Sequence, residues 1–251
     1  VMKRRTILKA TSAAFLASTA AQAQAWPNRP ITMFVPFAAG GPSDMFGRIL
    51  ARGLSAELGQ QVVVENKGGM GGLVGVAAIA KSAPDGYTIG MNATGPTAIA
   101  PFMVPNMPFE DKDLALLPPI ALVQMIVAVS SRLPVNSVAE LIAYAKANPG
   151  KVNYGSSGPG GISHLAAELF ARSAGFRVTH VTYRGVTPAL TDVLRGEVTM
   201  MFAQVSTAKP LIDSGHFRAL GIASATRRPA LSGVPTIAAV GMPGFAAVSW
   251  S

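Results

Sequence analysis

Two segments of the chain repeat one local pattern: a short apolar strand, a turn of small residues, and the start of a helix. The first turn is 36–44, PFAAGGPSD, which follows the apolar run 31–35 and precedes a helical pattern from Met45. The second is 154–164, YGSSGPGGISH, which follows 151–153 and precedes the helical run 165–174. The first N–H groups of a helix have no acceptor within it, and glycine lets an anion approach them closely. The repeated pattern therefore predicts two loops that hold one small anion from both sides.

The rest of the chain alternates between strand and helix patterns. Strands are expected at 31–36, 61–65, 87–91, 120–129, 152–155, 178–182, 197–202 and 217–223, and helices at 44–58, 73–81, 138–147, 163–174, 186–195 and 206–213. Ser43, Ser137 and Ser163 are expected as N-caps, with Glu140 completing a capping box. This alternation predicts an α/β protein with mainly parallel sheets. Such sheets bind ligands at the carboxyl ends of their strands, where both turns lie.

Composition excludes several classes of protein and site. The chain has 251 residues, of which 49% are hydrophobic and 13% charged, and this argues against disorder. It has no cysteine, and its three histidines lack metal-ligand spacing, so neither a disulfide nor a metal site is expected. The formal net charge of +9 is spread without a basic stripe, so nucleic acid is not an expected partner. A solvated basic surface and steering of anionic small molecules both fit this charge.

Residues 1–25 have the pattern of an export signal peptide. Lys3, Arg4 and Arg5 form a charged segment, a mildly apolar stretch follows, and 21–25 offers small-residue cleavage sites. Cleavage after Ala25 would make Trp26 the first residue, and a soluble exported protein is expected. The two arginines fit a twin-arginine signal and an ordinary Sec signal equally well.

The motifs of common enzyme classes are not met. The turn 68–72 lacks the lysine of a phosphate-binding loop, the first loop lacks dinucleotide-fingerprint spacing, and 155–158 is not a nucleophile elbow. His164 lies too close in sequence to these serines for a nucleophile–base pair, so no catalytic residue and no cofactor is expected. Asp44 has two open interpretations: it accepts from N–H groups of its own helix start, or it contacts a ligand or orients the loop.

Further matches run in order from residue 26 to the end of the chain. They comprise WPNRPI (26–31), VPF with GGPSD (35–44), VENKGG (64–69), PDGYT (84–88), AKANPGK (145–151), NYGSSG (153–158), HLAAELF (164–170), YRG (183–185), PALTD (188–192) and VPT (234–236). In these segments the chain resembles the tripartite tricarboxylate transporter receptors, the Bug-type (TctC-like) periplasmic solute-binding proteins.

The resemblance implies a two-domain periplasmic-binding-protein fold of the type II Venus-flytrap kind that closes on a small organic carboxylate. Domain 1 would comprise 26–125 and 247–251, and domain 2 would comprise 126–246. It also implies a monomeric, non-enzymatic receptor whose partners are membrane transporter subunits. The ligand contacts that it implies are Phe37, Ala39, Gly41, Ser43 and Asp44 in the first loop, Ser156, Gly158, Ser163 and His164 in the second, and Thr94, Gly185, Pro188 and Ala189 elsewhere in the cleft.

The chain departs from the family at its end. Family members continue beyond the Ser-Trp at 249–250 and return to the first domain, so a fragment lacking the C-terminal part of domain 1 is expected. Two alternative functions stay open: an exported α/β enzyme acting on a carboxylate, and a periplasmic sensor subunit with the same fold. The sequence does not separate di- or tricarboxylates, amino acids and aromatic acids as ligands.

Overall fold

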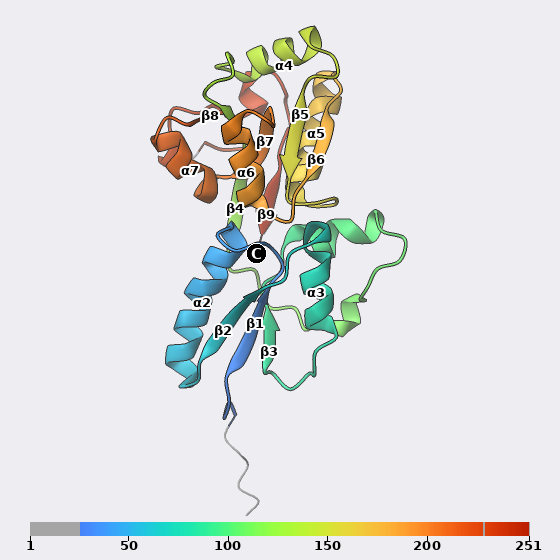
Figure 1. The fold of residues 1–251 in the computed structure, drawn as a ribbon, viewed down its shortest axis with the longest axis vertical. Helices are drawn as coiled ribbons and strands as arrows, with labels where there is room; N and C mark the ends of the chain where they lie inside the picture. The colour runs from blue at the N-terminus through green and yellow to red at the C-terminus, as the bar shows by residue number, and fades with distance from the viewer. Residues whose placement is uncertain (1–25, 228, 251) are drawn as a thin grey trace, which may run out of the picture.

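The computed structural model describes residues 26–227 and 229–250, which form two α/β lobes stacked along the long axis of the molecule (Figure 1). We call 26–121 lobe 1 and 126–246 lobe 2. The segments 122–125 and 247–250 run between them and pair with one another as antiparallel strands. We propose that the lobes are the two domains expected from the sequence. The expected signal peptide, 1–25, lies outside the described residues.

Lobe 1 is built on a parallel sheet with the strand order β2-β1-β3. The strands are β1 (Ile31–Val35), β2 (Val62–Asn66) and β3 (Thr88–Gly90). Helices α2 (Pro42–Leu58) and α3 (Leu73–Ala80) lie on opposite sides of this sheet (Figure 1). The apolar stripe of α2 packs against Ile31 and Met33 of β1, as its helical spacing predicts. The proline-rich stretch that follows β3 forms only short helical turns, at 95–99, 100–102 and 111–113.

Lobe 2 contains a larger, mixed sheet with the order β6-β5-β7-β4-β8. Its strands are β4 (Leu122–Ser130), β5 (Asn153–Ser156), β6 (Thr179–Thr182), β7 (Met200–Gln204) and β8 (Phe217–Ile222), and β9 (Val248–Trp250) pairs with the start of β4. β5 is parallel to β6 and β7, whereas β4 is antiparallel to β7 and β8. The chain enters lobe 2 through β4, so β4 begins at the junction between the lobes where its neighbours end.

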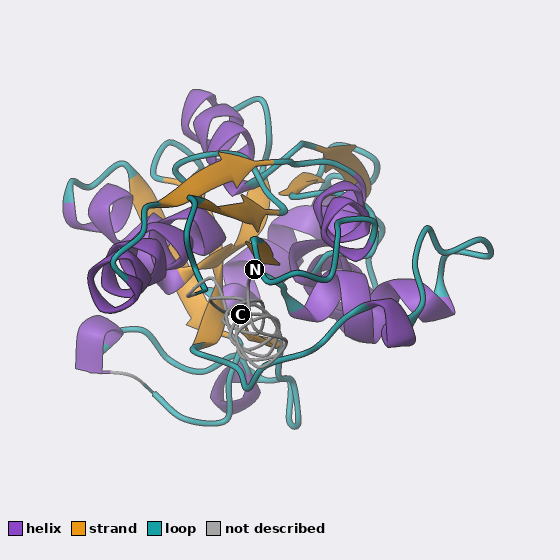
Figure 2. Cartoon of the chain, turned by 90° about the horizontal axis from the view of Figure 1, so that it is seen from below, coloured by secondary structure: helices purple, strands orange, loops and turns teal. Residues whose placement is uncertain are grey.

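From Val123 onward the residues of β4 are buried on both faces of the sheet, which explains the apolar run 125–129. Met125, Val127 and Val129 share one core with α4 (Val138–Ala147) and α5 (Ile162–Ala174). Ile126 and Ala128 share the other with α6 (Val186–Arg195) and α7 (Val205–Asp213). Figure 2 shows the helices lying outside the strands in this arrangement. The predicted alternation of strand and helix is thus confirmed.

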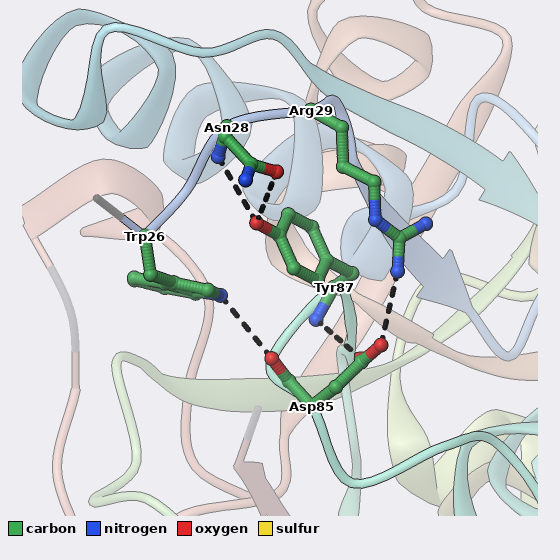
Figure 3. A network of polar contacts seen from close by, with 5 residues as sticks. All are labelled: Trp26, Asn28, Arg29, Asp85 and Tyr87. Atoms are coloured by element: carbon green, nitrogen blue, oxygen red, sulfur yellow. Dashed lines mark hydrogen bonds and ion pairs between the residues drawn. The ribbon is translucent and has the colours of Figure 1, made fainter. Parts of the chain in front are cut away.

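The N-terminal segment of lobe 1 is fixed by a polar network at the amino ends of β1 and β3, away from the junction between the lobes (Figure 3). Arg29 forms an ion pair with Asp85 at 2.9 Å, and its guanidinium lies 3.9 Å from the centre of the Tyr87 ring. The Tyr87 hydroxyl accepts from the backbone N–H of Asn28, and the Trp26 indole donates to the carbonyl of Asp85. Two of the segments that carried the family resemblance therefore have a structural role.

No helix within 26–227 and 229–250 has both the length and the apolar character needed to cross a membrane.

Candidate ligand-binding cleft

A cavity of about 30 Å³ lies between the lobes, at the carboxyl ends of strands from both sheets. A volume of this size holds about two water molecules, so the lobes leave little room between them. No lining side chain is charged; the lining residues are Phe37, Gly41, Pro42, Ser43, Gly71, Ala93, Gly95, Ser157, Gly161, Ile162, Val186, Gln204 and Ser249. The two sequence repeats, the first loop (36–44) and the second loop (154–164), face this cavity from opposite lobes.

Four helices begin at the cavity. Helix α2 follows its N-cap Gly41, α5 follows Gly161, α6 begins at Val186, and α7 follows its N-cap Gln204. The N–H groups of each first turn have no acceptor within their helix, and each helix dipole places partial positive charge there. Because four such ends converge, the cavity suits an anion without any lysine or arginine in its wall. The described part of the chain contains no cluster of residues that could hold a metal ion.

The Asp44 side chain fixes the first loop through hydrogen bonds. One carboxylate oxygen accepts from the Gly40 N–H at 2.9 Å and from Arg48 at 3.0 Å, and the other accepts from the Asn66 amide at 2.9 Å. Burial alone would raise the pKa of Asp44, but the hydrogen bonds from Arg48, Gly40 and Asn66 outweigh it and hold this pKa below its ordinary value. The N–H that Asp44 accepts from is that of Gly40, which precedes the helix, so these contacts fit the second interpretation in its form of orienting the loop.

The N-caps of α2 and α5 differ from the prediction. Ser137 caps α4 as expected, and its hydroxyl accepts from the Glu140 N–H at 3.1 Å. The expectation that Ser43 and Ser163 are caps is wrong, because the caps are Gly41 and Gly161. Pro42 takes the first position of α2, where its fixed φ suits a helix start, and this moves Ser43 into the first turn.

The second loop is held by neutral groups. Ser163 is buried, and its hydroxyl accepts from the Ser157 N–H at 3.1 Å. The Nδ1 atom of His164 accepts from the Gly160 N–H at 3.1 Å. The rings of His164 and His180 stack at 4.4 Å between centres, and Tyr154 stacks on His180 at 4.9 Å. A charged group contacts the loop at its start, where the Tyr154 hydroxyl donates to the Glu168 carboxylate at 2.7 Å.

Burial lowers the pKa of both stacked histidines. For His164, burial lowers the pKa and the charge of Glu168 opposes this in part. For His180, burial and the neighbouring His164 lower the pKa, again opposed by Glu168. The lowered pKa of His164 agrees with the role of its Nδ1 atom, which must be unprotonated to accept from Gly160.

Ser156 and His180 form a hydroxyl–imidazole contact, of the kind found in nucleophile–base pairs, that the sequence analysis did not anticipate. The Ser156 hydroxyl lies 2.6 Å from Nε2 of His180, across neighbouring strands β5 and β6. Ser156 is fully buried, and its oxygen also accepts from the Gly158 N–H at 3.0 Å. The expectation that the chain holds no such pair is therefore corrected, but Ser156 does not line the cavity.

The two lobes meet backbone to backbone at glycines. A Cβ at Gly158 would overlap the backbone nitrogen of Gly71, and a Cβ at Gly71 would overlap the carbonyl oxygen of Pro159. On another side of the cleft, a Cβ at Gly68 would approach the carbonyl oxygen of Arg184 to 2.8 Å. The lobes can approach this closely only where side chains are absent.

The expected ligand contacts occupy several kinds of position around the cleft. Phe37, Gly41 and Ser43 line the cavity, while Asp44, Ser156, Ser163 and His164 support the loops. Thr94 accepts from the backbone N–H of Trp250 in β9 at 3.0 Å. Gly158 and Gly185 lie where the lobes touch, Ala39 and Pro188 are exposed, and Ala189 is fully buried in the core of lobe 2.

Sequence reasoning missed most residues of the cavity wall. Those not anticipated are Pro42, Gly71, Ala93, Gly95, Ser157, Gly161, Ile162, Val186, Gln204 and Ser249. Most of them follow the end of a strand or begin a helix, as Gln204 does at the end of β7. The rule that ligands bind at carboxyl strand ends would have found several of them, had it been applied to every strand.

A model of one protein family matches residues 46–251, and its description is "Tripartite tricarboxylate transporter family receptor" (TctC). The match covers the larger part of α2, the second loop and all of lobe 2.

Three solved structures resemble the chain closely, and each covers 90% of it. R. palustris Rpa4515 with adipate is 37% identical, with 76% of that chain covered and a TM-score of 0.84. The periplasmic binding protein BugD is 36% identical, with 75% covered and a TM-score of 0.82. MatC (Rpa3494) from Rhodopseudomonas palustris, with bound malate, is 30% identical, with 77% covered and a TM-score of 0.85. The two-lobed architecture described above is thus that of periplasmic binding proteins.

Proposed function

Since the chain belongs to the tripartite tricarboxylate transporter family of receptors, we propose that it captures a small organic carboxylate between its lobes. The observation that carries this proposal is the convergence of four helix N-termini on one cavity without a charged side chain. Backbone N–H groups and helix dipoles favour an anion. The adipate and malate named with two similar structures are carboxylates and support this ligand class.

Capture would require the lobes to separate and close again. The cavity of about 30 Å³ is too small for a dicarboxylate, so a ligand enters only when the cleft opens. The start of β4 and the paired β9 are the segments that cross between the lobes and would act as the hinge. Closure would then bury the ligand and bring the glycines of the two lobes into contact.

The receptor would work in the periplasm and deliver its ligand to the membrane subunits of a transporter. The signal-like pattern of residues 1–25 and the family of the chain support this location and partnership. A sensor subunit with the same fold is the second candidate, and the two differ in which membrane partner recognises the closed form. The ligand contacts inferred from the sequence remain part of this proposal, joined by the other residues of the cavity wall.

The contact between Ser156 and His180 raises the alternative of an enzyme that acts on a carboxylate. Their hydrogen bond resembles that of an activated nucleophile. The Ser156 side chain is fully buried, however, and its oxygen already bonds to Gly158 of the same loop. We infer that this pair supports the second loop and does not attack a substrate.

Thermal unfolding of the purified protein with a panel of carboxylates tests the receptor function. Malate, adipate, citrate, aspartate and benzoate serve as probes, with glucose as a neutral control. A probe at a hundred times its Kd stabilises the folded state by about 2.7 kcal/mol and raises the Tm. NMR of the same samples must show the probe unchanged after prolonged incubation. Absence of a shift with every carboxylate, or consumption of a stabilising probe, would overturn the proposed function.

A further inference from the structure

A groove of about 610 Å³ lies at the end of lobe 2 that points away from lobe 1 (Figure 1). It runs between the end of α4 and the loop that joins α5 to β6, and its lining residues are Ala145, Lys146, Pro149, Gly150, Gly175, Phe176, Arg177, Val178 and Thr179. Helix α5 has 13 residues, begins beside the cavity between the lobes and ends at this groove, so about 20 Å separate the two. The groove therefore belongs to lobe 2 alone.

The groove combines an apolar floor with positive charge. Ala145 is buried in the floor, and Phe176 and Val178 are half-buried there against the core of lobe 2. Lys146 and Arg177 are exposed at its wall, and no lining residue is acidic. A binding partner would thus meet apolar contact and two cations in one place.

Lys151 and Arg172 add two further exposed cations beside the groove. Among residues 26–227 and 229–250, none of these four basic side chains forms an ion pair. The acids of the same two helices are used elsewhere: Glu140 lies in the first turn of α4, and Glu168 accepts from the Tyr154 hydroxyl. The described part of the chain thus leaves four positive charges without an ionic partner.

Helix dipoles account for only two of these cations. Lys146 and Arg172 lie in the last turns of α4 and α5, where a cation offsets the partial negative charge of the helix end. Lys151 and Arg177 lie beyond the ends of the helices, so the dipoles give no reason for them. The segment 145–151 is also one of those that carry the family resemblance, although it lies away from the cleft. This charge therefore points to an occupant of the groove.

The chemistry of the groove decides which occupant fits. A free inorganic anion binds where N–H groups converge, but two helices end here, and helix ends present carbonyl oxygens. A bilayer surface would contact the exposed cations and leave the apolar floor unused. A protein segment whose carboxylates flank an apolar side chain uses both features, because the apolar group covers Phe176 while the carboxylates pair with Lys146 and Arg177.

We propose that this groove is a docking site for an acidic segment of a partner protein. All of its lining residues belong to lobe 2, so the opening and closing of the cleft leave it unchanged. A partner docked here holds the empty and the loaded protein with equal affinity. The docking site does not depend on the carboxylate receptor function, and either can fail without the other.

NMR titration of the ¹⁵N-labelled protein with three acetylated and amidated peptides tests this site. EEFEE carries both features, QQFQQ lacks the charge, and EESEE lacks the apolar side chain. EEFEE is expected to bind at least about tenfold more tightly than the other two, with amide shifts gathered at 145–151 and 172–179. Excess malate should leave its affinity unchanged. Equal binding of QQFQQ, or shifts confined to the cavity between the lobes, would refute the docking site.

Charge reversal separates the groove from the general field of the protein. Arg177→Glu should weaken EEFEE about tenfold, because a like charge then faces the peptide, and it should strengthen binding of the basic peptide KKFKK. Arg132→Glu is the matched control, since Arg132 is exposed in lobe 2 outside the groove and the change of net charge is the same. It should alter the affinity for EEFEE less than about twofold.

Two results would overturn the proposal. Equal losses of affinity in Arg177→Glu and Arg132→Glu would assign the binding to net charge and not to the groove. Sedimentation of the protein with vesicles that contain phosphatidylglycerol, without any binding of EEFEE, would assign the four cations to a membrane surface. Thermal unfolding of both variants checks that they remain folded, which is expected because both side chains are exposed.

Discussion

The first and second loops present the same kind of helix start to one cavity, but the structure supports them by different chemistry. The first loop rests on a charged group, Asp44, which bonds to the loop and to Arg48. The glycine-rich part of the second loop, 157–161, rests on neutral groups, the Ser163 hydroxyl and the unprotonated Nδ1 of His164. Two loops with the same anion-binding geometry can therefore be stabilised by side chains of different chemistry. It also implies that the two halves of one site respond differently to mutation, acid and salt.

Removing the buried support of each loop should give the largest contrast. Asp44→Ala removes a charged acceptor that bonds to the Gly40 N–H, to Arg48 and to the Asn66 amide, which costs about 3 kcal/mol of unfolding free energy. Ser163→Ala removes one neutral hydrogen bond, from the Ser157 N–H, and costs about 1 kcal/mol. Urea unfolding of both variants measures the difference. Equal losses would show that the charged and neutral supports are equivalent.

Each loop also contains a glycine with positive φ, and these two glycines should differ in their effect on ligand binding. Gly158 (φ +125°) faces the backbone of Gly71 in lobe 1, whereas a Cβ at Gly40 (φ +75°) would meet only the Thr187 hydroxyl, at 3.7 Å. Gly158→Ala should therefore hinder closure and weaken the tightest-binding probe about a hundredfold, or about 2.7 kcal/mol. Gly40→Ala, the matched control, carries backbone strain of about 1 kcal/mol and should change affinity less than tenfold. Titration calorimetry decides, and unaltered binding by Gly158→Ala would refute backbone contact as the requirement for closure.

Mild acid should destabilise the second loop and spare the first. The pKa of His164 is lowered in the folded protein, so below about pH 6.5 the unfolded chain binds a proton that the folded chain does not. Stability is therefore complete above pH 6.5 and falls as the pH decreases toward the lowered pKa; His180 acts in the same direction. The pKa of Asp44 is also lowered, so its contribution persists until the pH falls below about 3.9.

Thermal unfolding between pH 7.5 and 4.5 measures this dependence. His164→Gln retains an acceptor for the Gly160 N–H and does not titrate, so it should flatten the curve. His216→Gln alters an exposed histidine outside the loop and serves as the control. A curve for His164→Gln as steep as that of the unmodified protein would exclude His164 as the source of acid sensitivity.

The smallest effect should come from the exposed partner of Asp44. Arg48 is half exposed, and its ion pair with Asp44 spans 3.0 Å. Arg48→Gln should cost about 0.5 kcal/mol, and 0.5 M NaCl should reduce the difference between the two proteins. Urea unfolding at low and high salt tests both statements. A loss of unfolding free energy as large as that of Asp44→Ala would indicate that the first loop depends on the ion pair and not on the other hydrogen bonds of Asp44.

Local patterns in the sequence predicted the elements, because helix and strand periodicity depend on near neighbours. The helix expected at 44–58 is Pro42–Leu58, and the strand expected at 152–155 is Asn153–Ser156. The placement of each loop at a carboxyl strand end followed from the rule for parallel sheets. Because β1 and β5 belong to different sheets, that rule did not determine how the two loops face one another. The predicted cap of α2 failed because Pro42, directly after the glycine pair 40–41, fixes the helix start earlier than Ser43 would.

Features that depend on pairing between distant segments were beyond this reasoning. The direction of β4 depends on where the chain enters lobe 2, which no local pattern records. Ser156 meets His180 only because β5 and β6 pair in a register that places Tyr154 beside His180. In the sequence Gln204 looks like an ordinary strand end. Only the packed structure shows that its Oε1 atom has no hydrogen-bond partner among the described residues.

The glycine contacts between the lobes have a consequence for how such a receptor can diversify. The surfaces that meet on closure are main chain, at Gly71 against Gly158 and at Gly68 against Arg184, while the cavity wall also carries side chains such as Phe37 and Ile162. The contacts that hold the lobes together are thus separate from the side chains that face the cavity. Exchanging the side chains around the cavity can change the ligand without altering the main-chain contacts between the lobes, so one fold can supply many receptors.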